Sequence, residues 1–72
     1  MTKFDYANSK MAFLIAEYVH SERDRGILSR RYLDRIGHER IAEEFQMSVR
    51  QIQNIDYRFQ KKVILPHKDE LL

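Results

Sequence analysis

The sequence HERIAEEFQMSVRQIQNIDYRFQKKVI, residues 38–64, carries the pattern that decides the fold. Its apolar residues recur at steps of three and four, which is the spacing of one side of an α-helix. Ser48 is followed three residues later by Gln51, and this Ser-x-x-Gln pattern is typical of the capping box that opens a helix. We therefore predict a short helix over residues 38–45, a brief connection, and a second helix over residues 48–64.

Each of these two helices has one apolar side. Ala42 is small, so it allows the first helix to cross a neighbour closely. We expect the second helix to end as it approaches Pro66, because the residue before a proline avoids helical backbone angles. The inward positions predicted for the pair are Ile41, Ala42, Phe45, Ile52, Ile55, Phe59 and Val63.

Two more helices are predicted in the first half of the chain. One spans about residues 9–20 and is capped by Asn8 or Ser9, and the other spans about residues 22–34 and is capped by Ser21. With the pair described above they make an all-α fold, a four-helix domain. The inward positions predicted for these first two helices are Met11, Leu14, Ile15, Tyr18, Val19, Ile27, Leu28 and Tyr32.

The length and composition fit one small domain over residues 1–72. The chain is 43% hydrophobic and 33% charged, with a formal net charge of +2. Because it has no cysteine, disulfides, thiolate zinc sites and cysteine nucleophiles are excluded. It has no apolar run of the roughly 18 residues that a membrane span needs, and no signal-peptide pattern. We therefore expect a soluble, cytoplasmic protein with no membrane partner.

A short helix, a tight turn and a second helix capped by serine are the layout of a DNA-binding helix-turn-helix. On a helical wheel, the side of the second helix opposite its apolar seam is polar, and residues 50–62 hold four basic side chains against one acid, Asp56. Arginine can bridge two acceptors on guanine, and asparagine or glutamine can pair with adenine. We therefore predict that residues 48–64 form a recognition helix that lies in the major groove of double-stranded DNA.

The predicted contacts divide by the part of the DNA that they touch. Side chains near the start of a recognition helix insert deepest, and those expected to contact bases are Arg50, Gln53, Asn54 and, on the same stripe, Tyr57. Side chains on the later turns, on the preceding helices and at the cap are expected to contact phosphates, namely Ser48, Arg31, Arg40, Arg58, Lys61 and Lys62.

Residues from about 22 to 62 resemble the fourth region of bacterial sigma factors and its stand-alone relatives, which include phage and mobile-element regulators. The resemblance implies a helix-turn-helix core over residues 22–64, an N-terminal helix extension over 1–20 and a C-terminal tail over 65–72. The stretches that carry it are Ile27-Leu28, Arg31-Tyr32-Leu33, Glu39-Arg40-Ile41-Ala42-Glu43-Glu44-Phe45, Met47-Ser48 and Arg50-Gln51-Ile52-Gln53-Asn54-Ile55.

The resemblance also implies a function and some local differences. The recognition helix would enter promoter DNA, RNA polymerase is a further expected partner, and Val49 would take a base-contacting position through a methyl contact to thymine. Arg30 stands where the family usually has an apolar residue. Arg35 and Gln46 stand where it usually or often has glycine, and Gly37 is expected to supply part of the missing flexibility. The chain has no room for the sigma-factor region that opens promoter DNA.

Two other classes of function compete with DNA binding. Catalysis is disfavoured because the three histidines, His20, His38 and His67, are spread over different elements, and we predict no catalytic residue, metal site or cofactor. A module that docks on RNA polymerase or another regulator, without reading DNA, is the serious alternative, since mixed polar helix faces are often merely solvated.

Apolar residues near both ends of the chain exceed what so small a core needs. They either cover the ends of the core or form an interface, and if they are exposed together we expect a homodimer. A homodimer would present two recognition helices to a palindromic site. These residues are Phe4, Tyr6, Phe13, Ile64, Leu65, Leu71 and Leu72.

Overall fold

The computed structural model describes the backbone of residues 3–71 and the side chains of residues 8–69. Within this range the chain is helical and has no strand, so the prediction of an all-helical fold is confirmed for the described residues. The four main helices are α1 (Lys3–Tyr18), α2 (Glu22–Tyr32), α3 (His38–Phe45) and α4 (Val49–Phe59). The backbone then continues through η1 (Gln60–Ile64), η2 (Leu65–His67) and α5 (Lys68–Leu71).

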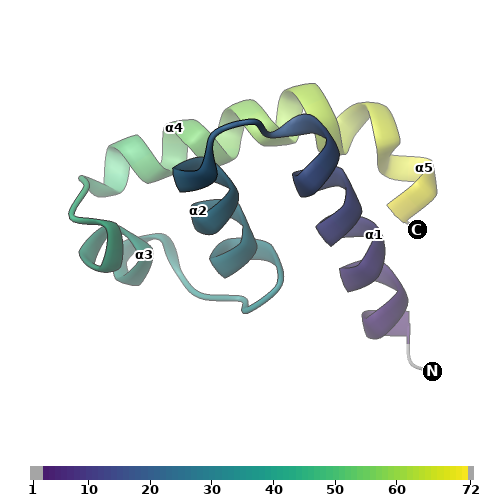
Figure 1. Ribbon diagram of the computed structural model, residues 1–72, viewed down its shortest axis with the longest axis horizontal. Coiled ribbons are helices and arrows are strands. Elements are labelled where there is room, and N and C mark those ends of the chain that lie inside the picture. The colour runs from purple at the N-terminus through teal and green to yellow at the C-terminus, as the bar shows by residue number, and fades with distance from the viewer. Residues whose placement is uncertain (1–2, 72) are drawn as a thin grey trace.

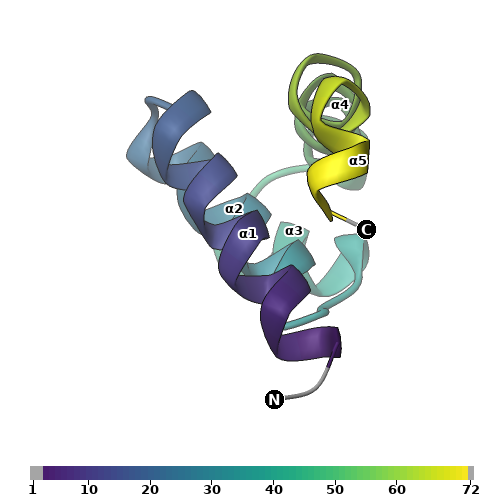
Figure 2. The same cartoon turned by 90° about the vertical axis from the view of Figure 1, so that its right-hand side faces the viewer.

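Helix α4 and its continuation run along one edge of the molecule, and the other helices lie beneath that edge (Figure 1). Helix α4 contacts α3 and α2, while α1 contacts α2 and α5. The view along the long axis shows α1 and α2 on one side of the molecule and α4 and α5 on the other (Figure 2). One side of α4 therefore packs on the molecule, and its other side borders no other described element.

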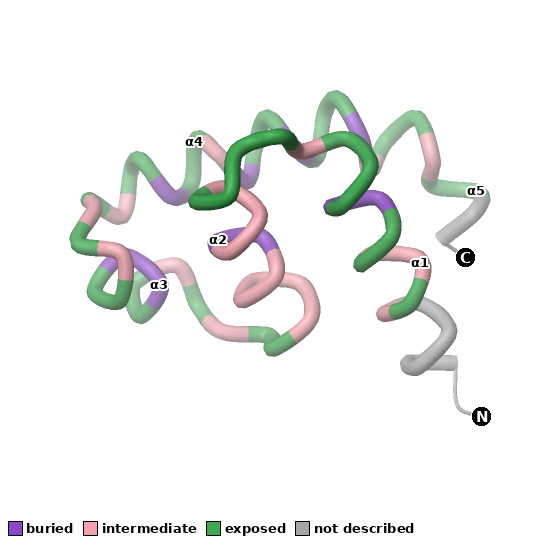
Figure 3. The backbone as a smooth tube through the Cα atoms, in the orientation of Figure 1, coloured by how far each residue is buried: buried purple, intermediate pink, exposed green. Residues whose placement is uncertain are grey.

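The apolar core consists of two clusters that share α2 and α4. The α1 cluster joins α1, α2 and the end of α4, and its buried members are Leu14, Ile15, Leu28, Phe59 and Val63. The α3 cluster joins α2, α3 and the start of α4, and its buried members are Ile27, Ile41, Ala42 and Ile52. Figure 3 shows the buried positions of α4 on the side that faces α2. These residues were predicted to face inward, because they follow the spacing of one side of a helix.

The caps predicted at Ser21 and at Ser48 are present. The hydroxyl of Ser21 accepts a hydrogen bond from the amide of Asp24 at 3.3 Å, at the start of α2. At the start of α4, Ser48 and Gln51 form a complete capping box, with each side chain accepting from the other residue's amide, at 3.1 and 2.9 Å. Each bond satisfies an amide that lacks a partner in the first helical turn, which fixes where the helix begins.

The first helix differs from its prediction at both ends. Helix α1 begins at Lys3, so Asn8 and Ser9 lie inside it and cap nothing. No glycine or proline interrupts residues 3–8, and Ser9 is exposed, so the helix passes through these polar residues. The guanidinium of Arg25 donates hydrogen bonds to the carbonyl of Ala16 in the last turn of α1, at 2.8 Å, and to that of Val19 directly after the helix. A basic side chain at this end also suits the helix dipole.

The end of the long C-terminal helix was also predicted incorrectly. Leu65, the residue before Pro66, has helical backbone angles of φ −59° and ψ −48°, so helical backbone does not stop there. Instead, η1 widens into a π-helical turn in which the amide of Leu65 bonds the carbonyl of Gln60. In a regular helix the ring of a proline clashes with a carbonyl of the preceding turn, and the proline has no backbone N–H to donate. A π turn changes the hydrogen-bond register and so accommodates the proline. The segment predicted as a tail therefore continues as helical turns to Leu71.

Two connections contain residues in the left-handed backbone region. Arg35, between α2 and α3, has φ 59°, and Gln46, between α3 and α4, has φ 54°. These are the two positions at which the resembled family usually or often has glycine, the residue that adopts this conformation without strain. Gly37 has an ordinary φ of −71°, so the prediction that it supplies the missing flexibility was wrong. The chain instead holds two ordinary residues in a conformation that costs each of them free energy.

Candidate nucleic-acid interface

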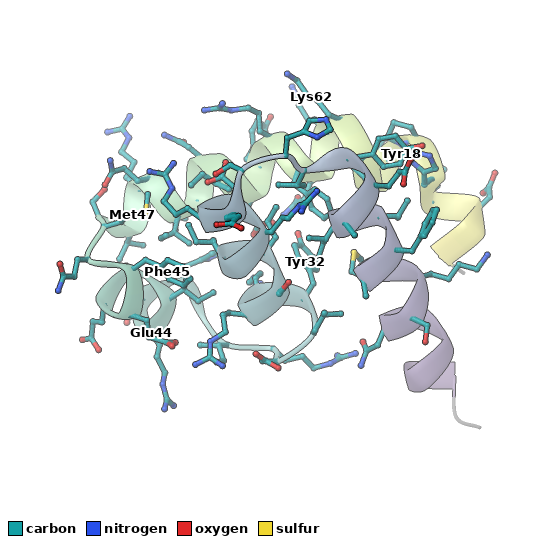
Figure 4. All side chains as sticks on the ribbon, viewed as in Figure 1. Tyr18, Tyr32, Glu44, Phe45, Met47 and Lys62 are labelled. Carbon is teal, nitrogen blue, oxygen red and sulfur yellow. The ribbon has the colours of Figure 1, made fainter. Side chains whose placement is uncertain are left out.

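The solvent-facing side of α4 and its first continuation is polar, basic and uncovered. We name it the α4 outer face, and its members, all exposed, are Arg50, Gln53, Asn54, Tyr57, Arg58, Lys61 and Lys62. Tyr57 keeps 59% of its surface exposed, and the ammonium of Lys61 lies 5.0 Å from the centre of its ring. Figure 4 shows Lys62 projecting away from α2. Helical periodicity produces this face, because its members alternate with the buried Ile52, Phe59 and Val63.

The members of the α4 outer face include no acidic side chain. Arg50, Arg58, Lys61 and Lys62 are exposed, whereas Asp56, the single acid of residues 50–62, is only 3% exposed on the opposite side of the helix. Arg50, Arg58 and Lys62 make no hydrogen bond or ion pair with any other described side chain. The face therefore presents cations whose charge is not neutralised within the described residues, and such cations attract phosphate.

Asp56 is the buried centre of a polar cluster that sequence reasoning missed. Its Oδ1 accepts hydrogen bonds from the hydroxyl of Tyr32 and, at 3.1 Å, from Nε2 of the Gln60 side chain. Its Oδ2 lies 2.7 Å from Nε2 of His38 and 3.6 Å from Nε of Arg31. The signal was present, because Asp56 follows Ile52 by four residues and precedes Phe59 by three, and so shares their inward side.

The Asp56 cluster shifts the pKa values of its acidic members in opposite directions. Burial alone raises the pKa of a carboxyl, but the hydrogen bonds from its neighbours outweigh this and hold the pKa of Asp56 below its ordinary value of 3.8. Burial and the bond to Asp56 raise the pKa of Tyr32 above its ordinary value of 10.0. At neutral pH, Asp56 is therefore a carboxylate and Tyr32 keeps the proton that it donates.

The remaining predicted contact residues lie in different surroundings. Val49 is half-buried and packs against the α3 cluster, and the hydroxyl of Ser48 is engaged in the capping box. Arg40 is exposed on α3. Arg31 is half-buried beside Asp56, and its Nε is buried without a hydrogen bond to any described residue. The structure thus groups the predicted residues of α4 on one face, while Arg31 and Val49 turn partly inward.

Arg30 joins α2 to α3 instead of extending the basic surface. Its guanidinium contacts the carboxylates of Asp34 at 3.0 Å and Glu44 at 2.5 Å. The bond to Glu44, followed by that to Asp34, raises the pKa of Arg30 above its ordinary value. Figure 4 shows Glu44 on the side of the molecule opposite Lys62. The Arg30 position is therefore a surface ion pair, which explains how an arginine can stand where the resembled family has an apolar residue.

A groove borders the α4 outer face at the α1–α2 connection. Its volume is about 210 Å³, its floor is apolar, and Arg58 and Lys62 stand on one wall. The opposite wall comes from the connection and the first turn of α2, including His20, Ser21 and Asp24. The imidazole of His67 does not line the groove, but it lies 5.0 Å from the ring of Tyr18, which does. No group of three potential metal ligands occurs among the described residues.

Large apolar side chains near the two ends are partly exposed. Phe13 keeps 62% of its surface exposed, Leu65 60% and Tyr18 48%, so the prediction that Tyr18 faces the core was wrong. Tyr18 lies at the last residue of α1, where its ring meets His67 rather than the apolar clusters. Four of the terminal apolar residues that were expected either to cover the ends of the core or to form an interface lie outside the described side chains, namely Phe4, Tyr6, Leu71 and Leu72. No helix of the described chain has the length and apolarity to cross a bilayer.

Comparisons of the chain with protein-family models, with curated proteins and with solved structures returned no match.

Proposed function

We propose that this chain binds double-stranded DNA in a sequence-specific manner as a small transcriptional regulator, and that α3 and α4 act as its helix-turn-helix. The observation that carries the proposal is the α4 outer face, which is basic, free of acid and not covered by other described segments. In this proposal the face enters the major groove, and the opposite, apolar side holds the helix on the molecule.

The residue types along α4 support this proposal in two ways. Arg50, Gln53 and Asn54 lie in its first turns, and these are the side chains that pair with guanine or adenine edges in the major groove. Arg58, Lys61 and Lys62 follow in later turns, where a helix leaves the groove and meets phosphates. An α-helix with its side chains is about 10–12 Å across, which suits a major groove roughly 12 Å wide.

A selection of duplexes from a random library, followed by sequencing, tests the proposal. We expect a defined motif to emerge. On that motif Arg50→Ala or Asn54→Ala should cost about 1–3 kcal/mol of binding free energy and relax the base preference, because each removes one base contact. Lys61→Ala should weaken binding to all duplexes alike and flatten the salt dependence.

Lys68→Ala is the matched control, because it removes one exposed positive charge from α5 rather than from the α4 outer face. It should change binding less than Lys61→Ala does. Selection that yields no motif, or a motif whose binding survives both Arg50→Ala and Asn54→Ala, would reject the proposal. A palindromic motif would indicate two copies per site, as the homodimer hypothesis requires.

A second candidate function is docking on RNA polymerase or another regulator, and the exposure of Phe13 and Leu65 favours it. If docking is the main role, capture of polymerase should persist in Arg50→Ala and Asn54→Ala and should be lost in Phe13→Glu or Leu65→Glu. Loss of capture with the α4 variants alone would remove docking as a separate function.

A further inference from the structure

Three helices meet at the carboxylate of Asp56. Tyr32 belongs to the last turn of α2, His38 is the first residue of α3, and Gln60 follows directly after α4. All three side chains bond the same carboxylate, and Arg31 of α2 adds a cation 3.6 Å away. Asp56 is the one buried charged side chain among the residues whose side chains are described.

The Asp56 cluster lies where the two apolar clusters adjoin. One helical turn before Asp56, Ile52 belongs to the α3 cluster, and one turn after it Phe59 belongs to the α1 cluster. The ring of Tyr32 packs on Phe59 with 5.5 Å between ring centres, so the hydroxyl that bonds Asp56 is held by apolar contact. Apolar packing is tolerant of small shifts, whereas hydrogen bonds to one carboxylate are directional. At this junction the hydrogen bonds to Asp56 therefore fix the orientation of α4, which the apolar contacts alone would leave adjustable.

The opposite side of the same helical turn bears the side chains proposed to read DNA. Asn54 precedes Asp56 by two residues, and Tyr57 follows it directly, so a rotation of α4 about its axis moves the anchored and the exposed side chains together. A shift of about 1 Å at a base edge takes a donor outside the narrow range of hydrogen-bond distances. The accuracy of base contacts therefore depends on how firmly α4 is held.

We propose that Asp56 is a positioning residue which, by tying α4 to the end of α2 and the start of α3, sets the angle at which the α4 outer face meets DNA. This inference rests on the proposed function. Asp56 touches no base and no phosphate in it, and it acts through Arg50 and Asn54.

The orientation of α4 can be measured without DNA. The chain has no cysteine, so a double variant with Glu43→Cys on α3 and Arg58→Cys on α4 can be labelled with nitroxides at these two positions alone. Double electron–electron resonance then measures the distance between the two labels. We expect a narrow distance distribution in the labelled parent. Asp56→Asn should broaden or shift it, and Tyr32→Phe, which removes one donor but keeps the ring, should do so to a smaller extent. Ile15→Val, a loss of one buried methylene group in the α1 cluster, should leave it unchanged.

The DNA measurement uses the unlabelled variants at a temperature at which circular dichroism shows each of them folded. For Asp56→Asn, the ratio of affinity for the selected motif to affinity for random duplex should fall about tenfold, the order of one well-aligned base contact. Affinity for random duplex and its salt dependence should not change, because the exposed cations are still present. Ile15→Val should keep the parent ratio, which separates positioning from a general loss of stability.

An unchanged label distance in both Asp56→Asn and Tyr32→Phe would overturn the positioning role. So would a parent-like affinity ratio in Asp56→Asn. A parent chain that prefers no duplex would instead overturn the proposed function, and the label distances would still decide whether Asp56 sets the orientation of α4.

Discussion

The first half of α4 is held by apolar packing on α2 and α3, whereas its second half, together with η1, is held by a buried carboxylate and by packing on α1. Ile52 lies in the α3 cluster and is fully buried, and the helix start is defined by the Ser48 capping box. Asp56 of α4 and Val63 of η1 depend on residues far away in the sequence, on α2, α3 and α1. The start of α4 therefore carries a local signal, the capping box, that its second half lacks.

The largest expected effect compares one apolar residue of the first half of α4 with one of η1, which continues the second half. Ile52→Ala should cost about 3–4 kcal/mol of unfolding free energy, because it leaves a cavity at a fully buried site. Val63→Ala should cost about 2 kcal/mol, since fewer buried methyl groups are lost and the site retains some exposure. Urea unfolding followed by circular dichroism measures both values. Equal losses would indicate that the two halves are anchored alike.

The carboxylate of the second half makes stability depend on pH. Because the folded-state pKa of Asp56 lies below 3.8, its contribution is fully present above pH 3.8 and is lost as pH falls through the lower folded-state value. Asp56→Asn should cost about 2–3 kcal/mol near pH 6, through lost hydrogen bonds to a charged group. The gap between the parent and the variant should shrink at pH 3 and below. Urea unfolding at several pH values between 3 and 6 measures the difference in unfolding free energy between the parent and the variant. A difference that does not change with pH would contradict the assigned role of the carboxylate.

The capping box of the first half predicts a smaller effect. Ser48→Ala should cost about 1 kcal/mol, because an amide in the first turn of α4 loses its acceptor. Ser21→Ala is the matched control, since the hydroxyl of Ser21 caps α2 at the longer distance of 3.3 Å and its cap is not reciprocal. The loss should be smaller there. A larger loss at Ser21 would mean that the capping box is not what defines the start of α4.

The smallest effect should be a gain, at the connection that leads into α4. Gln46 has φ 54°, so Gln46→Gly should stabilise the fold by about 0.5–1 kcal/mol through relief of backbone strain, less the entropy that glycine adds to the unfolded chain. Glu43→Gly, an exposed position inside α3, should destabilise by about 1 kcal/mol. Thermal unfolding of the two variants measures both changes in stability. A loss of stability in both variants would show that the backbone at position 46 is not strained.

The part of the fold that follows from local chemistry was predictable. The bounds of α3, the start of α4 at its capping box and the inward side chains of both helices agree with their predictions. The end of the long helix was not predictable from local chemistry. The tendency of Pro66 to end a helix is overcome by a π turn, which keeps Val63 in the core. The cap predicted at Asn8 or Ser9 is likewise absent, because polar residues can also lie within a longer helix.

The candidate site was predictable as a face but not as a set of partners. Arg50, Asn54 and Lys61 follow helical spacing, so the wheel placed them together on the exposed side. The environment of Asp56 and the pairing of Arg30 depend on how α2 and α3 pack, and no local pattern specifies that packing. From the sequence, Asp56 was counted only as the single acid of residues 50–62, although its spacing from Ile52 and Phe59 puts it on their inward side, where a buried acid needs partners.

The most direct test of DNA reading by α4 is to map the amide chemical shifts of the isotope-labelled chain by nuclear magnetic resonance while a selected duplex is added. We expect the largest changes at Arg50, Asn54 and Tyr57, with smaller ones at Arg40 and little change at Phe13. Changes centred on Phe13 and Leu65, with the amides of α4 unaffected, would contradict the account.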